Sequence, residues 1–420
     1  MANMMKWTTL EEGWDLHLSE QELFDDPMPY YHELRATAPV FDSPSGFWFV
    51  TDYENTEAIL REDGRGDDSP WTRTGVQASL PPHLSGDGLL PKYYTGKMNF
   101  NEEQHDRVRR LMSPQFLPRS VESMREPARE FAHELINRAE ATGTNQMDVV
   151  KDFGLAIPTR MILTMLGIDV SETERMNHAA DEIVYSFEPA AMTDTEWQVR
   201  VEEVLAERYQ YIVDLAEERH RNPTDDLFSH LVAGMHEDPP LISIDELVMN
   251  VIFLVVAGLE TTANGIASGV HLFLKNPDQL ELLKSDWDLL PDAIEEILRI
   301  APATRGSAPK WAIRDVEMGG VTVPKGAQIR TSTIAANRDP AEFEDPDRFD
   351  ITRDLSGNRQ LAFAPFSAFY CLGHALARLE MAESLKALLT RCPNLALADE
   401  DVHYRRSLQL YGPQALHVTW

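Results

Sequence analysis

Cys371 combines a reactive side chain with a distinctive local setting. It follows a run of small and aromatic residues, Ala364 to Tyr370, and directly precedes a predicted helix. A sulfur at the start of a helix faces unpaired amide groups and the positive end of the helix dipole, which favour the thiolate. The thiolate is the form of cysteine that binds a metal such as iron. The alternative is a small buried side chain, which is what we expect for Cys392, before Pro393.

A second unusual segment lies within a long apolar pattern. Residues 251–258 are apolar on every side, as in a helix buried in a protein core. The pattern is then interrupted by Gly258, Glu260 and Thr261, and polar groups inside a core require partners. Gly258 permits close approach of a planar ligand, and a threonine hydroxyl bonded to a backbone carbonyl loosens the helix locally. Such an opening holds water and relays protons; a kinked helix with a satisfied glutamate is the alternative.

Two charged pairs occur at helical spacing. Glu296 and Arg299 are three residues apart, and His105 and Arg109 are four apart, so each pair shares one face of a helix. Taken alone, the first pair indicates a solvated surface ion pair, which contributes little to stability. The second pair is either an anion-binding face or a group of surface side chains.

A mainly helical chain must position these residues. Apolar periodicity, with breaks at proline and glycine, predicts helices in four regions: 105–231, about 243–274, 292–300, and from Cys371 to about Leu389. Strand-like runs are shorter, and they lie at 47–51, 316–319, 321–323, 328–333 and within 408–420. Residues 64–98 are rich in Gly, Pro and Ser without a period, which is typical of a functional loop. No linker or repeat divides the sequence, so we expect a single, mainly α domain with a minor β region over residues 1–420.

The composition excludes several classes of function. The chain has 420 residues with 69 acidic and 38 basic side chains, which gives a formal net charge of −31. This charge repels nucleic acids and anionic membranes over a Debye length of about 10 Å. No apolar run approaches the roughly 20 residues that cross a bilayer, and the N-terminal segment lacks a signal-like core. We expect a soluble, cytoplasmic protein whose two cysteines form no disulfide framework.

These separate signals occur together and in one order. Ala257 to Thr262 is similar to an oxygen-activation motif, and Glu296 to Arg299 matches a Glu-x-x-Arg motif. Pro346-Asp347-Arg348-Phe349 matches the segment whose arginine joins that pair in a buried triad. Cys371-Leu372-Gly373, followed by Ala375 to Glu380, matches a haem-ligand motif and its helix. With these motifs the chain resembles a bacterial soluble cytochrome P-450 over essentially its whole length.

The resemblance implies a fold, a cofactor and a set of site residues. The implied fold is the single-domain cytochrome P-450 fold, with haem between the long buried helix and the helix after the Cys loop. The implied cofactor is haem b with Cys371 as axial thiolate, while Thr261 and Glu260 stabilise bound dioxygen and deliver protons for O–O cleavage. The remaining cofactor-binding residues that it implies are His105, Arg109, Lys310, Ala257, Gly258, Phe366, Gly373 and Ala377.

The sequence departs from the family's pattern at two places. The loop before the cysteine normally reads Phe-Gly-x-Gly-x-His-x-Cys, but Ala364 to Tyr370 contain no glycine, and Phe369 stands where His or Arg belongs. Lys310 stands where a strand normally offers a propionate-binding arginine, and lysine binds as a point charge without the bidentate fork. We hypothesise that the altered loop changes the hydrogen bonds to the sulfur, and with them the reduction potential of the iron.

The implied activity is that of a monooxygenase, which puts one atom of O2 into a substrate and releases the other as water. The pocket segments carried over from the family are about Trp71 to Lys97, Asn250 to Thr261, Ala303 to Ser307, and Leu408 to Tyr411. They suit a medium-sized, mainly apolar molecule of the terpenoid, steroid, fatty acid or polyketide class. Arg73 and Arg305 are either partners for a substrate carboxylate or surface residues.

The electrons must come from a separate protein, because two cysteines cannot ligate an iron–sulfur cluster that needs four. Arg107, Arg110 and Arg119 are a candidate docking patch for an acidic ferredoxin, since they stand out against the acidic remainder. We expect a monomer with no membrane anchor and no nucleic acid partner. Two alternatives stay open: the same oxidant used for desaturation or aromatic coupling, and a haem-binding protein without oxygen activation.

Overall fold

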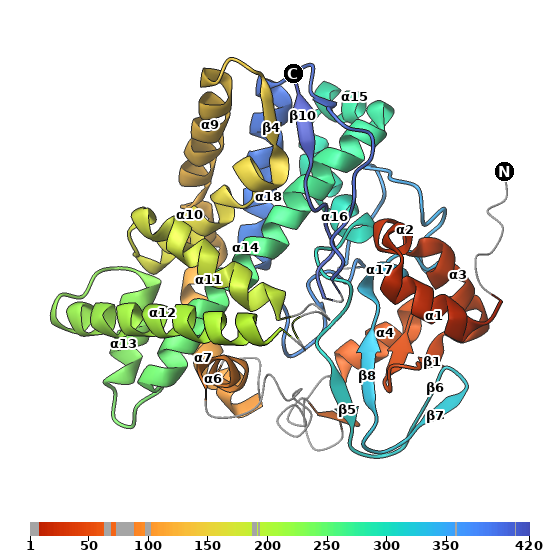
Figure 1. Ribbon diagram of the computed structural model, residues 1–420, viewed down its shortest axis with the longest axis horizontal. Helices are drawn as coiled ribbons and strands as arrows, with labels where there is room; N and C mark the ends of the chain where they lie inside the picture. Colours follow the sequence, from red (N-terminus) through yellow and green to blue (C-terminus); the bar gives the residue numbers. More distant parts are fainter. Residues whose placement is uncertain are drawn as a thin grey trace. The chain divides into compact units, whose positions relative to one another are not determined.

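The computed structural model describes residues 8–62, 69–72, 88–96, 102–186, 191, 194–357, 359–407 and 409–420 (Figure 1). The chain divides into two compact units, each assembled from stretches that are distant in sequence. The first unit comprises residues 1–75, 268–371 and 399–416, and the second comprises the rest, 76–267, 372–398 and 417–420.

The first unit contains a five-stranded sheet with the order β1-β2-β8-β5-β3. In that order its strands are Val40–Asp42, Trp48–Val50, Gln328–Thr331, Lys310–Ala312 and Trp71–Thr72. Strand β2 runs parallel to β8, and the other neighbours are antiparallel. Buried side chains of Val50, Trp71 and Ile329 belong to the apolar cluster of this sheet. Because Lys310 belongs to β5, the sheet fixes the position of its backbone.

A two-stranded ribbon, β6 (Val316–Met318) and β7 (Val321–Val323), follows β5. Its turn consists of Gly319 and Gly320, which both have positive φ, 54° and 78°. Glycine is the residue that adopts this conformation without a steric penalty, so this dipeptide determines the hairpin. The ribbon and β8 confirm the strands expected between residues 316 and 331, but the strand expected to reach residue 333 ends at Thr331, because Ser332 caps a helix that begins at Thr333.

The helices of the first unit include three that precede the sheet and four that follow its strands. They are α1 (Leu10–Ser19), α2 (Gln21–Asp25), α3 (Met28–Thr37), α4 (Tyr53–Arg61), α15 (Pro277–Ser285), α16 (Leu290–Ile300) and α17 (Thr333–Ala336). The Asp52 side chain accepts a hydrogen bond from the Asn55 amide and so caps α4. Pro291 lies in the first turn of α16, where a backbone N–H would have no intrahelical acceptor. The missing N–H of proline therefore costs nothing there, and Pro291 suits the start of this helix.

The second unit is dominated by helices. They are α6 (Leu89–Gly96), α7 (Glu102–Met112), α8 (Pro118–Glu122), α9 (Arg125–Ala141), α10 (Ala156–Leu166), α11 (Thr173–Tyr185), α12 (Thr195–Arg221), α13 (Leu227–Met235), α14 (Ile244–Lys275, which continues into the first unit) and α18 (His374–Arg391). Helices α11 and α13 both pack on α12, and α9 packs on α18 (Figure 1). A small antiparallel sheet, β4 (Gln146–Asp148), β10 (His417–Thr419) and β9 (Ala396–Leu397), completes this unit.

Helix α14 is the long helix that the apolar pattern predicts. It starts with a capping box, in which the Ser243 hydroxyl accepts from the Glu246 amide and the Glu246 carboxylate accepts from the Ser243 amide. It is the one helix among the described residues that is long and apolar enough to cross a membrane, but 72% of its apolar window is buried inside the protein. A core helix of a soluble protein passes the same test, so its apolar character reflects the core.

Candidate functional site

One face of α14 is partly exposed although the helix around it is buried. Between residues 247 and 270 the half-buried positions are Phe253, Ala257, Gly258 and Thr261, and every other residue is buried. Their spacing of four, one and three residues places them on one stripe of the helix. A Cβ atom added to Gly258 would meet no atom within 4 Å, so this stripe borders open space. The Thr261 hydroxyl donates to the Ala257 carbonyl at 2.6 Å, as the sequence predicts.

A polar stripe runs along another side of the same helix. Glu260, Asn264 and Ser268 follow one another at four-residue spacing and are all at most 1% exposed. The Asn264 side-chain amide has no hydrogen-bond partner among the described protein groups. Buried polar groups of this kind are typical contacts of ordered water. The stripe thus gives α14 the polar, water-compatible side that a proton relay needs.

Helix α18 packs directly on α14 within the second unit. A Cβ atom added to Gly265 would lie 3.0 Å from the Met381 sulfur, so glycine is what allows this close approach. Near the start of α18, Gly373 and Ala377 are half-buried, and a Cβ atom added to Gly373 would meet no atom within 4 Å. Glu380 is 2% exposed, and burial raises the pKa of its carboxyl well above the ordinary value. Both helices therefore offer small, partly exposed residues of the kind that a flat cofactor needs.

The loop before Cys371 adopts conformations that glycine normally supplies. Ala364 has φ 52° and Phe366 has φ 69°, both in the left-handed region. Ala364 and Phe366 therefore adopt the backbone conformation that glycine favours, in the loop where the family's pattern carries glycines. The Arg61 guanidinium lies 3.9 Å from the centre of the Phe366 ring and holds it by a cation–π contact.

The two cysteines differ in their surroundings as predicted. Cys371 is half-buried, its amide donates to the Phe363 carbonyl at 3.0 Å, and α18 begins three residues later. Cys392 is 1% exposed, and burial raises the pKa of its thiol to about 11. A raised pKa disfavours the thiolate, so Cys392 is confirmed as a core residue.

The predicted propionate-binding residues lie on ordered elements. Lys310 in β5 is 1% exposed, and its ammonium donates to the Ser307 hydroxyl at 3.3 Å. His105 and Arg109 lie one turn apart on α7; His105 is 1% exposed and Arg109 is half-buried. The surface alternative is therefore wrong for His105. Contact of these three residues with a propionate remains a prediction.

The Glu296–Arg299 pair is buried, as the resemblance implies. The spacing of the two residues alone had indicated a solvated surface ion pair, and that interpretation is wrong. Both side chains are 0% exposed, and the Arg299 guanidinium donates two hydrogen bonds, of 2.7 and 2.8 Å, to the Glu296 carboxylate. The predicted third member, Arg348, is wrong: its side chain is exposed, and its main-chain carbonyl accepts from Arg299. Arg353 takes that place, because its Nε donates to Glu296 at 3.3 Å.

The structure also tests two other arginine predictions. Arg107 is ion-paired with Glu246 at 2.5 Å and donates to the Leu241 carbonyl, so the prediction of an available docking cation is wrong. Arg305 is 5% exposed and lies between the rings of Phe24 and Tyr411, so the surface alternative is wrong. Arg73 and most of the predicted pocket loop, residues 73–87 and Lys97, lie outside the described residues.

Comparison with known proteins shows what family this arrangement belongs to. The cytochrome P450 family model matches residues 90–405. The chain is 35% identical to 6-deoxyerythronolide B hydroxylase of Saccharopolyspora erythraea, over 92% of this chain and 94% of that protein. It is 36% identical to mycinamicin IV hydroxylase/epoxidase of Micromonospora griseorubida, over 93% and 94% of the two chains.

Solved structures agree with these sequence relatives. The crystal structure of P450BioI with a hexadec-9Z-enoic acid-ligated acyl carrier protein superposes with a TM-score of 0.84 at 31% identity, covering 96% of this chain and 100% of that chain. CalO2 superposes with a TM-score of 0.87 at 27% identity, covering 96% and 98%. The matches extend over nearly the whole length of each protein, and the residues matched by the family model, 90–405, include α7, α14, the Cys loop and α18. This chain therefore belongs to the cytochrome P450 family and is a monooxygenase that uses haem b with a cysteine thiolate as axial ligand.

Proposed function

We propose that this cytochrome P450 hydroxylates or epoxidises a medium-sized, mainly apolar polyketide, with O2 and electrons from a separate ferredoxin-type protein. The proposal narrows the classes that the sequence left open. Two relatives at 35% and 36% identity have names that specify the hydroxylation of 6-deoxyerythronolide B and the hydroxylation or epoxidation of mycinamicin IV. A fatty acyl substrate is the runner-up, because P450BioI is described with a fatty acid-ligated carrier protein.

The residues present fit haem b. Cys371 is half-buried in a loop before a helix start, whereas burial holds Cys392 in the thiol form. The two glycines beside open space, Gly258 on α14 and Gly373 before α18, leave room for a flat ring. We assign Cys371 as the axial ligand, and Ala257, Gly258, Phe366, Gly373 and Ala377 as ring contacts, with His105, Arg109 and Lys310 at the propionates. When bound, the haem supplies an iron that activates O2.

Thr261 and Glu260 are proposed to handle the protons of this reaction. The Thr261 hydroxyl donates its own hydrogen to Ala257, which leaves the oxygen lone pairs to accept a hydrogen bond from a water molecule. Such a water is then held on the partly exposed stripe of α14, next to the buried Glu260 carboxyl. Glu260 begins the buried polar stripe of α14, which supports its assignment as the residue that passes protons toward that water. This stripe is the observation that carries the proposal.

The substrate is proposed to lie along the partly exposed stripe of α14. Phe253 and Ala257 present apolar surface there, which favours an apolar substrate through burial of its surface. The test is a screen of polyketide and fatty acyl compounds for displacement of the iron-bound water, followed by product analysis with a surrogate ferredoxin. We expect a polyketide product with one added oxygen atom. A product that has only lost two hydrogens would show desaturation instead, and a fatty acyl product would select the runner-up.

Substitution Thr261→Ala tests the proton relay, with Thr262→Ala as the matched control one residue away. We expect Thr261→Ala to consume reductant with at least about tenfold less product, since one general acid–base group contributes roughly 10²–10⁴-fold. Thr262 is buried away from the stripe, so its substitution should leave the ratio of product to reductant unchanged. A chain that only binds haem would turn over no substrate in either form, and equal yields in both variants would refute the assigned role of Thr261.

The electron donor is proposed to dock on Arg110 and Arg119. Both side chains are exposed, and Leu117, which lies between them in sequence, is 55% exposed, so an exposed apolar side chain accompanies the two basic ones. Basic side chains around an apolar residue suit an acidic partner, because charge steers the encounter and apolar contact holds it. Arg107 is not included in this patch, because it is ion-paired with Glu246.

A further inference from the structure

Helix α6 begins with a cap that comes from a distant part of the chain. The backbone amides of Leu89 and Leu90 donate to the two oxygens of the Glu202 carboxylate, at 2.6 and 2.9 Å. Glu202 lies on α12, and both helices belong to the second unit. The start of α6 is therefore attached to α12 by a charged side chain.

The Glu202 carboxylate satisfies the whole start of this helix. The Lys92 amide already donates to the Gly88 carbonyl at 3.2 Å, and Pro91 has no amide hydrogen. The two amides bonded to Glu202 are thus those of the first turn that need an acceptor from outside the helix. The negative charge also lies at the positive end of the helix dipole. A Cβ atom added to Gly88 would lie 2.5 Å from a carboxylate oxygen, so glycine makes room for this contact.

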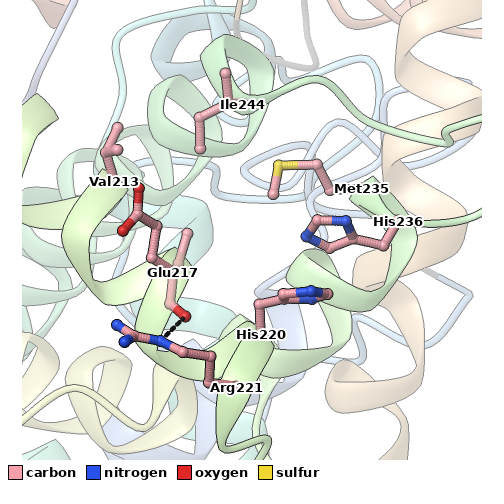
Figure 2. A pocket seen from close by; sticks show the side chains of 8 residues that line it. Val213, Glu217, His220, Arg221, Met235, His236 and Ile244 are labelled. Carbon is pink, nitrogen blue, oxygen red and sulfur yellow. Dashed lines mark hydrogen bonds between the residues drawn. The ribbon is translucent and has the colours of Figure 1, made fainter.

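Helix α12 is a firm support for this carboxylate, because it is held along its length. Near Glu202 its inner side is buried, with Trp197 and Val201 0% exposed and Leu205 1% exposed. Its last turn meets the end of α13 beside a groove of about 470 Å³, where the rings of His220 and His236 stack with centroids 3.7 Å apart (Figure 2). Contacts with α11 and α13 complete this support.

Helix α6 itself depends on such support. It has eight residues, and a helix of this length is not stable alone in water. Leu90 and Tyr93 are 2% and 1% exposed, so packing holds one side of it, while the Glu202 carboxylate holds its start. The helix lies within Trp71 to Lys97, the segment assigned by resemblance to the substrate pocket. The position of α6 therefore bears on how firmly that pocket retains a molecule.

We propose that Glu202 is a positioning residue for the substrate: its carboxylate holds α6 in place and thereby slows the release of a molecule bound beside the haem. This inference rests on the pocket proposed above, to which α6 belongs, and not on the polyketide class. Loss of the carboxylate leaves two amides without an acceptor, so the first turn of α6 opens more often. The residues assigned to the haem lie on other elements and stay in place.

Hydrogen exchange of the haem-loaded full chain tests the first step. Glu202→Ala should speed exchange of the Leu89 and Leu90 amides about fivefold, the usual effect of a lost helix cap. Glu203→Ala is the matched control, because Glu203 is the next residue of α12, is exposed, and carries the same charge. It should leave this exchange unchanged. Equal exchange in wild type and Glu202→Ala would overturn the proposal.

Stopped-flow release of 1-phenylimidazole from the haem iron tests the second step. We expect release at least about twofold faster in Glu202→Ala, because a pocket wall that opens more often frees its ligand more often. Glu202→Gln keeps one acceptor oxygen without the charge, so it should fall between wild type and Glu202→Ala. Glu203→Ala should match the wild type, and all variants should keep its carbon monoxide spectrum.

Faster exchange of α6 with unchanged release of 1-phenylimidazole would overturn the proposal, because Glu202 would then stabilise α6 without positioning a bound molecule. Equally fast release in Glu203→Ala would overturn it as well, since the effect would follow from net charge alone. A polyketide screen without product leaves these rates unaffected, because 1-phenylimidazole binds through the iron whatever the substrate.

Discussion

Replacing Arg353 should destabilise the protein far more than replacing Arg348. Arg353 donates to the buried Glu296 carboxylate at 3.3 Å, and also to the main-chain carbonyls of Glu344, Asp345 and Arg348. Its side chain is 13% exposed, whereas the Arg348 side chain is exposed to solvent. Each substitution with alanine removes one positive charge from a strongly acidic chain, so the long-range electrostatic effects of the two variants match.

The magnitude follows from the hydrogen bonds that are lost. A hydrogen bond to a charged group contributes about 1.5–3 kcal/mol, and the long 3.3 Å contact with Glu296 belongs at the lower end. The three carbonyl contacts lie at the surface and add roughly 0.5 kcal/mol each. Arg299 still neutralises Glu296, so the full penalty for an unpaired buried charge does not apply. We expect a loss of about 2–3 kcal/mol for Arg353→Ala and less than about 0.5 kcal/mol for Arg348→Ala.

Scanning calorimetry of the haem-loaded variants measures this difference. For a chain of 420 residues the unfolding entropy is about 0.9 kcal/mol per kelvin, so Arg353→Ala should lower Tm by about 2–3 °C. Arg348→Ala should lower it by less than about 1 °C, and Arg353→Lys should fall between, since lysine keeps the charge but not the planar fork. Equal shifts in the two alanine variants, or a larger shift for Arg348→Ala, would refute the assignment of Arg353.

Three further predictions follow from buried charge, backbone strain and surface charge. The raised pKa of Glu380 means that the folded state keeps a proton that the unfolded state releases, so stability should decline as the pH rises above about 4.5. Urea unfolding of Glu380→Gln should lack this decline, so its advantage over wild type should grow with pH; a constant difference would contradict the burial effect. Ala364→Gly should stabilise the folded protein by about 0.5 kcal/mol. Glycine removes the steric strain of the left-handed backbone at this position, and this gain exceeds the extra conformational entropy that glycine gives the unfolded chain; a lower Tm of the variant would argue against strain at Ala364. Charge reversal at Arg110 and Arg119 should lower ferredoxin-supported turnover at low salt but not at high salt, and unchanged turnover at low salt would reject the docking patch.

The elements of the site could be predicted because their signals are local. The apolar run of α14 depends on residues within a few turns, and α14 and α18 both lie where the sequence places them. The expected amphipathic pattern of α18 is wrong, because this helix is buried on several sides, with Glu380 and Glu383 among its buried residues. The turn at Gly319–Gly320 is likewise determined by its own two residues. The N-terminal helices α1 to α3 could not be predicted with the same ease, because they are short, of ten, five and ten residues, and their burial depends on partners distant in sequence.

Features that depend on tertiary contacts could not be predicted. Arg353 reaches Glu296 across 57 residues of sequence, and nothing near Arg353 indicates that contact. The left-handed conformations of Ala364 and Phe366 are also hidden in the sequence, since neither residue favours them and the surrounding structure imposes them. The partly exposed stripe of α14 lies within the predicted pocket segment Asn250 to Thr261, but the apolar pattern does not show which side of the helix is open, because Phe253 is as apolar as its buried neighbours and what it faces is decided elsewhere in the fold.

The most direct test of the account is the carbon monoxide difference spectrum of the reduced protein, recorded for the wild type and for two matched cysteine variants. The assignment of Cys371 as axial ligand predicts a Soret band at the thiolate position in the wild type. Cys392→Ser should keep this band, because the Cys392 thiol is buried with a raised pKa, and Cys371→Ser should lose it. A band at the position of nitrogen ligation in the wild type, or a thiolate band that survives in Cys371→Ser, would contradict the assignment.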